Sequence, residues 1–430
     1  MPAWARVVRD VVSQHVEEAA SLADRRRLQV RGANVRLKHL ARADERLAAH
    51  LDGVLVAGAE GARLAAAELS RPTHGSCFVA MVCAIQRSDA RAIDRLARAA
   101  AVEEAFASGL GSALQWSDDA AARPVVTQLM GLPGSHATAL ALDVATSHEI
   151  TVPLDSIRQA IRHGSPEAAS AAMRLCGRQR IVSLADVMAQ SMMTSRDEEV
   201  RYAAAHALFL IGDRIDATEI LRSLALTPGA CQASALSECM RLYSFDQATD
   251  LLAEARRLGG DTREVIVAAG ALGDPAAVPW LIASMSTPSL ARVAGEAFDN
   301  ITGADIAFLD LDRATEGFAN IALEETEGRS GAEALEPRPD ALKVENWWHA
   351  RSEQFARGRR YFVGAELSEA QLQWVLRTGW QRQRAAAAEY LFLWTSSPLF
   401  DVDAPGDRQR CRLGMDHDDL ADFPRSPPAG

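Results

Sequence analysis

The feature that most constrains this chain is a sequence pattern that recurs about every 31 residues. In the clearest copy, EEVRYAAAHALFLIGD, the residues Val200, Ala204 and Leu208 share one helical face, and Gly-Asp follows as a helix stop. A second apolar helix, ATEILRSLAL, comes next and ends before Thr-Pro-Gly. Equivalent positions of successive copies are 32, 31, 32 and 31 residues apart: Ala105, Ala137, Ala168, Val200 and Cys231.

Each copy predicts a helix, a short turn and a second helix. Neither helix could bury its apolar stripe alone, whereas stacked pairs bury a continuous core. The alanine-rich first helices fit such stacking, because small side chains let neighbouring helices approach closely. Since no segment shows sustained period-2 alternation, a β-sheet domain is not indicated. We therefore predict an all-α fold, an α-solenoid of about seven to nine helix pairs.

The pattern of an alanine-rich first helix, a glycine–acid turn and a short second helix resembles the short HEAT repeats of the phycobilisome-lyase type. This resemblance covers roughly residues 51–303. The stretches HLARADERLAAHLDGVLVAG, GRRYFVG and RTGWQRQRAAAAEYLFL, nearer the two ends, are similar to an uncharacterised bacterial HEAT-repeat family. Members of that family tend to be encoded beside type VI secretion genes, near spike-tip and effector-handling proteins. The resemblance implies a HEAT-like fold and brings no established activity with it.

We predict five segments along the chain. The acidic stretch EETEGRSGAEALEPRPDA interrupts the periodicity and carries two prolines. Helical character resumes after it, with Ser368 and Gln371 at the spacing of a capping box. The segments are an N-terminal helical cap (1–50), the HEAT-like repeat array (51–303), an acidic linker or loop (304–343), a C-terminal helical cap with a repeat-like helix pair (344–414) and a disordered tail (415–430).

Charge and cysteine usage narrow the classes of partner. The net charge of −11 and a pI near 5.5 make general nucleic-acid binding unfavourable, since such binding depends on neutralising phosphates. The six cysteines form no C-x-x-C pair and lie in apolar helical stretches, which is typical of free thiols in a core. The N-terminus lacks the pattern of a signal peptide, and no apolar run has the length of a membrane span. We expect a cytoplasmic protein with no membrane partner.

No catalytic or metal-binding set is recognisable in the sequence. Among enzymes built from HEAT repeats, deoxyhypusine hydroxylases bind two irons through several His-Glu pairs, and this chain has one such pair, His148-Glu149. His206 lies within an apolar helical face, where a hydrogen-bonded core histidine is favoured. Alkylpurine glycosylases of this repeat type grip DNA in a basic face, which the overall acidity disfavours. We predict no enzyme activity, no cofactor and no metal site.

An arginine-rich stretch with interleaved aromatic residues is the strongest functional candidate. Between Arg351 and Arg384, seven arginines minus three acids give a local charge of +4. The RGRR sequence around Gly358 predicts an exposed turn, so the candidate interaction surface is Arg357, Arg359, Arg360 and Tyr361. Trp347, Trp348 and Phe355 are spaced as on one helix face that packs on a core. We expect structural roles for Trp347, Trp348, Trp374, Trp380 and Arg384.

Arg384 occupies the register at which a HEAT-repeat arginine commonly pairs with an acid of the adjacent repeat. The sequence as a whole predicts a non-catalytic scaffold or adaptor that holds protein partners. The family resemblance implies an accessory of type VI secretion that binds a spike or effector component. The alternatives are a HEAT-repeat enzyme, metal-dependent or acting on nucleic acid, and a regulatory module that responds to a small anion at the arginine turn.

Overall fold

The computed structural model describes residues 7–260, 262–313, 337–395 and 397–416, which form an all-α fold. Of these residues, 7–30, 37–217 and 401–416 make up one compact unit, and 31–36 together with the described residues between 218 and 400 make up a second. The boundaries of the units cut across the predicted segments, because residues 31–36 and 401–416 are each grouped away from their neighbours in the chain. The predicted linker and tail fall largely outside the described residues.

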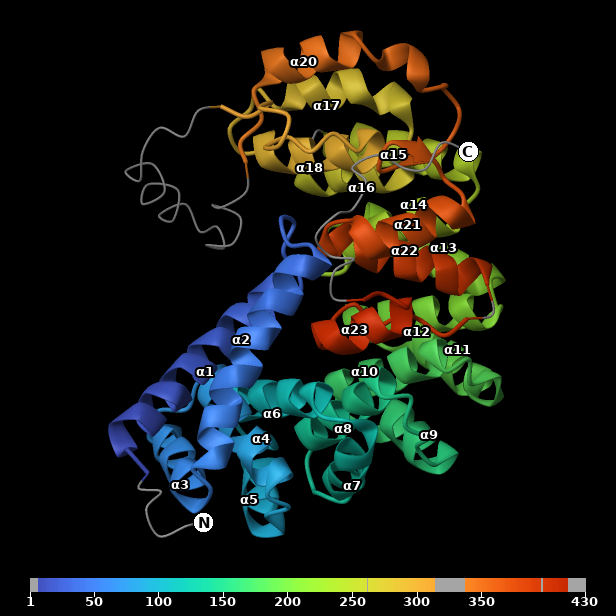
Figure 1. The fold of residues 1–430 in the computed structure, drawn as a ribbon. Coiled ribbons are helices and arrows are strands. Elements are labelled where there is room, and N and C mark those ends of the chain that lie inside the picture. Colours follow the sequence, from blue (N-terminus) through green and yellow to red (C-terminus); the bar gives the residue numbers. More distant parts are fainter. Residues whose placement is uncertain (1–6, 261, 314–336, 396, 417–430) are drawn as a thin grey trace. The chain divides into compact units, whose positions relative to one another are not determined.

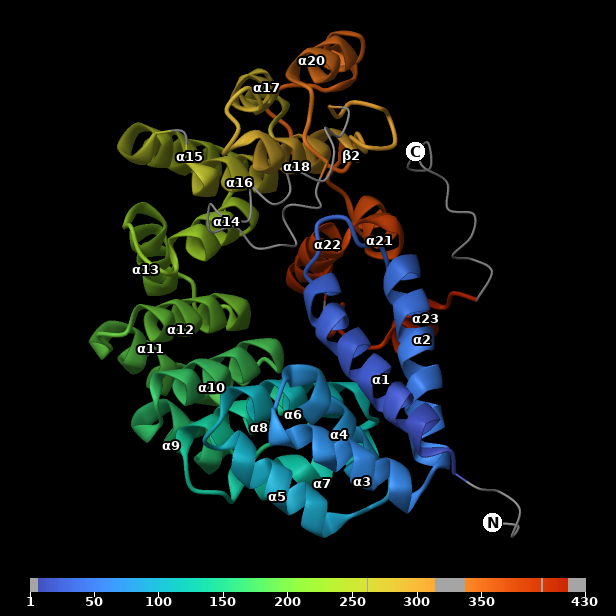
Figure 2. The same cartoon turned by 90° about the vertical axis from the view of Figure 1, so that its left-hand side faces the viewer.

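The first unit is a succession of packed helix pairs (Figures 1 and 2). Helix α1 packs along α2 and α4, and then α6, α8, α10 and α12 pack on one another in chain order. The helices are α1 (Arg9–Gln29), α2 (Leu37–Val56), α3 (Ala59–Ala67), α4 (His74–Gln86), α5 (Ala90–Ala100), α6 (Glu104–Trp116), α7 (Asp119–Met130), α8 (Ser135–Ser147), α9 (Leu154–His163), α10 (Pro166–Arg178), α11 (Ala185–Thr194), α12 (Glu198–Ile211) and α23 (Gly406–Leu413). Helix α13 (Ile215–Leu226) spans the boundary between the units.

The predicted helix of residues 198–211 illustrates how the sequence specifies these elements. Asp197 caps its start by accepting a hydrogen bond from the backbone N–H of Val200 at 3.0 Å. Gly212 ends the helix with a φ of +99°, the left-handed conformation that glycine adopts at little cost. The alanine side chains between these two residues are buried, and their small size lets α10 pack closely against the helix. The helix and its stop therefore agree with the sequence prediction.

The second unit continues the pattern with α14 on α16 and α16 on α18 (Figure 2). Its helices are α14 (Gln232–Leu242), α15 (Phe245–Gly259), α16 (Arg263–Leu272), α17 (Val278–Ser284), α18 (Ala291–Thr302), α20 (Ala341–His349), α21 (Glu369–Thr378) and α22 (Gln381–Trp394). A core of α16, α17 and α18 side chains, with Phe298 fully buried at its centre, is covered by Val344 and Trp348 of α20. The described residues of this unit also include one short antiparallel hairpin, β1 (Tyr361–Phe362) and β2 (Ala365–Glu366).

The cysteines follow the expected pattern except at one position. Cys77, Cys83, Cys176, Cys231 and Cys239 are buried, and burial raises the pKa of the Cys176 and Cys239 thiols to about 12. Cys411 on α23 is exposed, so the prediction that all six thiols lie in the core is wrong there. The part of α23 before Cys411 is mostly polar, so only one face of this helix is buried. Cys411 does not lie on that face.

Candidate functional site

The hairpin of residues 361–366 lies against the C-terminal ends of α16 and α18 in the second unit. The backbone N–H of Tyr361 donates to the carbonyl oxygen of Gly273, just beyond α16, at 2.8 Å. That of Val363 donates to the carbonyl oxygen of Asn300, in the last turn of α18, at 2.7 Å. Helix ends carry carbonyl groups without intrahelical partners, so the hairpin satisfies acceptors that would otherwise need water. The site is therefore built on helix termini.

Arg360 extends the same arrangement to a third helix. Its Nη1 donates to the carbonyl oxygen of Met240 and its Nη2 to that of Tyr243, each at 2.6 Å, at the end of α14. A cation at a helix C-terminus is also favoured by the helix dipole. Arg360 is half-buried and committed to these contacts, so it anchors the turn rather than offering a free charge.

The rest of the arginine turn, residues 357–360, is open to solvent. Arg357 is exposed, and Gly358 makes the turn with a φ of +75°. Arg359 donates through Nη1 to both carboxylate oxygens of Glu366, at 2.8 and 3.1 Å, with both side chains more than half exposed. Its guanidinium thus stays accessible on one side, since an exposed ion pair is weak.

Tyr361 ties the turn to the core. Its hydroxyl accepts a hydrogen bond from the backbone N–H of Ala356 at 3.0 Å, and its ring lies 5.1 Å from that of Phe355. Phe355 packs in turn on Trp348, with ring centroids 5.3 Å apart. Of the four predicted surface residues, Arg357 and Arg359 are thus exposed, whereas Arg360 and Tyr361 are fixed by internal contacts.

The tryptophans lie close to the core, with one difference from the sequence interpretation. Helix α20 ends at His349, so Phe355 is not on the same helix as Trp347 and Trp348. A 3-10 turn over Ser352–Gln354 brings Phe355 back onto the same cluster. Trp347 packs edge-on against Phe298, with ring centroids 5.6 Å apart. The guanidinium carbon of Arg351 lies over the Trp347 ring, 4.7 Å from its centroid.

Arg384 is the largest fully buried side chain of the described residues. Its Nε donates to the carbonyl oxygen of Leu376 at 2.7 Å, and Nη1 donates to the side-chain oxygen of Gln381. These contacts hold α22 against the end of α21. Trp374 of α21 is half-buried.

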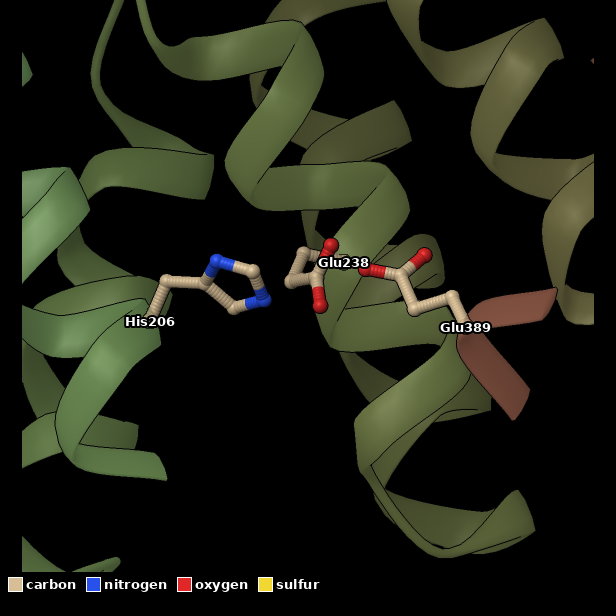
Figure 3. A group of neighbouring side chains, drawn as sticks. All are labelled: His206, Glu238 and Glu389. Atoms are coloured by element: carbon tan, nitrogen blue, oxygen red, sulfur yellow. The ribbon is translucent and has the colours of Figure 1, made fainter. Parts of the chain in front are cut away.

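A buried charge cluster joins α14 to α22, and Figure 3 draws Glu238 and Glu389 with their carboxylates facing each other. Arg241 contacts both acids, with 3.1 Å from Nη2 to Glu238 Oε2 and 2.8 Å from Nε to Glu389 Oε2. Glu238 is 2% exposed, so its charge depends on this arginine. One guanidinium thus lies between two carboxylates and holds the two helices together. His206, also drawn in Figure 3, belongs to α12 of the first unit and stacks on Tyr202.

Asp299 is a buried carboxylate on α18. It accepts hydrogen bonds from Trp380 Nε1 at 2.9 Å and from Gln383 Nε2 at 3.3 Å. Burial raises its pKa to about 7, with a further contribution from the neighbouring Asp305, while Arg36 opposes the rise. Arg36 stacks over the Trp380 ring at 3.8 Å and pairs with Asp305 at 3.0 Å. A perturbed carboxyl is a common mark of a functional site. Here its surroundings are protein groups that fix the 31–36 segment to α18 and α22.

A serine–histidine–aspartate constellation in the first unit was missed in the sequence. His74 at the start of α4 makes hydrogen bonds with Asp24 Oδ1 through Nδ1 at 3.1 Å and with Ser112 Oγ through Nε2 at 2.9 Å. These atoms come in the order that activates a serine nucleophile. Ser112 lies inside α6, however, where backbone N–H groups are bonded to the preceding turn, so that helix offers no oxyanion donors. Burial lowers the pKa of His74, and its ring bridges α1, α4 and α6.

His148, the predicted turn residue, has a comparable bridging role. It follows α8 and contacts Asp119 Oδ1 at 2.6 Å and the carbonyl oxygen of Leu114 at 2.8 Å, so it connects α8 to the ends of α6 and α7. Its neighbour Glu149 has a positive φ of 52°.

None of the helices that the structure describes has both the length and the apolarity to cross a membrane.

Comparison with known proteins identifies no relative: the chain matches no family model, no curated protein and no solved structure. Of the predicted interaction surface, Arg357 and Arg359 present exposed guanidinium groups on a turn whose base is fixed.

Proposed function

We propose that this chain is a non-catalytic scaffold or adaptor that binds an acidic protein partner through the arginine turn. The supporting observation is a difference in exposure among four neighbouring residues, two of which are exposed and two of which are held by internal contacts. Arg357 and Arg359 are exposed, while Arg360 and Tyr361 are held by Met240, Tyr243 and the aromatic cluster. A surface that is ordered before binding loses little conformational entropy on association. Arginine is also enriched among the residues that dominate binding energy.

The proposed architecture is a HEAT-like α-solenoid. The ordered packing of α6, α8, α10 and α12, and of α14, α16 and α18, supports it, as does the period near 31 residues. Repeats of this kind offer extended surfaces and commonly hold other macromolecules. In this proposal the arginine turn is one contact point on the second unit.

The resemblance of the chain's end segments to a bacterial HEAT-repeat family supports a more specific proposal. The partner would be a spike or effector component of type VI secretion, bound in the cytoplasm. An acidic patch on such a protein is the chemistry that the two arginines would recognise, through bidentate contacts to carboxylates.

The test compares partner recovery by tagged full-length chains, expressed in the native host together with the products of the neighbouring genes. In the variant Arg357→Glu/Arg359→Glu both exposed charges are reversed, and we expect loss of the secretion component that the wild type recovers. Arg95→Glu, at an exposed position of α5, serves as the matched control and keeps the partner. Equal recovery by the reversed and control variants would reject the arginine turn as the contact. Recovery of no secretion component by the wild type would reject the secretion role.

A further inference from the structure

Two histidines face each other within the first unit, away from the arginine turn in sequence. His15 of α1 and His50 of α2 approach through their Nδ1 atoms, which are 3.2 Å apart. The rings are edge-to-face, with centroids at 5.1 Å and an interplanar angle of 66°, and both side chains are half-buried. Two packed helices thus bring two imidazole nitrogens together in side chains that are only partly buried.

The backbone of α2 leaves room for this arrangement. Gly53 lies one turn beyond His50, and a Cβ there would come within 2.7 Å of Cδ2 of His15. Any side chain at this position would displace the His15 ring. The observed position of the His15 ring, and with it the facing of the two nitrogens, thus requires a residue without a side chain at position 53.

We propose that His15 and His50 form a binding site for a divalent transition-metal ion that bridges α1 and α2, and zinc serves as the probe for it. Imidazole nitrogens bind zinc at about 2.0–2.1 Å in tetrahedral geometry, which places two such nitrogens roughly 3.3 Å apart. The observed separation meets this requirement without movement of either helix. Imidazole ligands suit zinc, copper and nickel and are poor ligands for magnesium or calcium.

Metal binding by both Nδ1 atoms requires one of the two rings to change its tautomer. Without metal, one ring donates its Nδ1–H to the Nδ1 lone pair of the other. When the ion enters, the donating ring moves its proton to Nε2 by exchange with water, so both Nδ1 lone pairs face the metal. A neutral pair then releases no net proton. No bond to carbon changes.

The remaining ligands of the ion would be water. Among the described residues, no third histidine, cysteine or carboxylate lies close enough to join His15 and His50 as a ligand. A site with two protein ligands exchanges its ion readily and keeps open coordination positions. Its structural effect is to cross-link the N-terminal helix pair, since α1 packs along α2 as well as on α4.

The experiment uses the full-length protein after removal of metal with a chelator. Zinc binding is measured by calorimetry, and thermal unfolding is followed with and without excess zinc. For the wild type we expect one zinc per chain and an increase in Tm of about 2 °C or more, because an ion that binds the folded state stabilises it by mass action. His15→Gln and His50→Gln each weaken binding at least about tenfold and remove the increase in Tm.

The matched control is His163→Gln, because His163 is exposed at the end of α9, and this variant keeps both effects. The imidazole ¹⁵N resonances of the wild type give a readout that does not depend on the folding of any variant. Zinc shifts the Nδ1 resonances of two histidines together if the site exists. Absence of zinc binding by the wild type, or unchanged binding in His15→Gln and His50→Gln, would overturn the proposal.

Discussion

Arg360 Nη2 donates a hydrogen bond of 2.6 Å to the carbonyl oxygen of Tyr243, a residue 117 positions earlier in the chain. Together with the bond to Met240, this contact closes the end of α14 with a side chain from the hairpin segment. The first unit contains a parallel case. Arg408 of α23 donates to the carbonyl oxygens of Gln115, Trp116 and Ser117 at the end of α6. In both units an arginine from the C-terminal part thus satisfies the last carbonyls of an early helix.

Replacement of Arg360 by alanine is expected to lower the free energy of unfolding by about 2–3 kcal/mol, since hydrogen bonds to a charged donor are lost and two carbonyls lose a partner. Chemical denaturation followed by circular dichroism measures this change. Arg357→Ala removes the same type of side chain from an exposed position of the same turn and should change stability by less than about 0.5 kcal/mol. Equal effects of the two substitutions would contradict the anchoring role of Arg360.

Two glycines that end helices provide a second comparison. Gly212 and Gly273 both have positive φ values, +99° and +76°. A Cβ at Gly273 would lie 2.2 Å from the carbonyl oxygen of Tyr361, whereas one at Gly212 would meet nothing within 4 Å. Gly212→Ala should therefore cost about 1 kcal/mol for the left-handed backbone alone. Gly273→Ala should cost clearly more, because the hairpin must also move. Similar losses, measured by urea unfolding, would show that the hairpin adapts freely.

The sequence predicted the helices well because their information is local. Asp197 and Gly212 mark the two ends of α12 within the same short stretch that carries its apolar face. The all-α class follows from such stretches repeated along the chain. Ser368 accepts the predicted cap bond from the backbone N–H of Gln371 at 3.2 Å. The Gln371 side chain departs from the capping box, since its Nε2 donates to the carbonyls of Phe362 and Val363 and supports the hairpin.

The parts that the sequence did not predict depend on residues far apart in the chain. Strands of two residues each show no alternation, and the hairpin is held through Gly273 and Asn300 at the C-terminal ends of α16 and α18. The role of Arg360 is fixed by partners 117 and 120 positions away. Likewise nothing in the local sequence AFDNITG shows that Asp299 is buried beneath Trp380. Such contacts become visible only when the helices are packed.

The charge cluster on α14 and α22 predicts a large effect of a single substitution. Arg241→Met leaves Glu238 and Glu389 without the cation between them, and breaking a buried ion pair on one side typically costs about 3–5 kcal/mol. Urea unfolding of the full-length protein measures the loss. Adding Glu238→Gln and Glu389→Gln to the same chain removes both charges and should recover most of the stability. If the triple variant were no more stable than Arg241→Met, repulsion between the two acids would not be the cause.

Asp299 predicts a specific dependence of stability on pH. Its pKa rises from 3.8 to about 7 on folding, mainly through burial. Between these values the folded protein holds a proton that the unfolded chain has released, so the contribution of Asp299 to stability falls as pH rises from about 4 to about 7. At 1.36 kcal/mol for each pKa unit, the loss above pH 7 is at most about 4 kcal/mol.

Asp299→Asn keeps an oxygen that can accept from Trp380 Nε1 and cannot ionise. Denaturation measured from pH 4 to 8 should therefore show a variant that resembles the wild type at pH 4 and gains stability relative to it as pH rises. Asp310→Asn, at a 92% exposed side chain, should follow the wild-type profile throughout. A constant difference between Asp299→Asn and wild type across this range would mean that Asp299 is already ionised in the folded protein at pH 4, with Arg36 and Trp380 compensating for its burial.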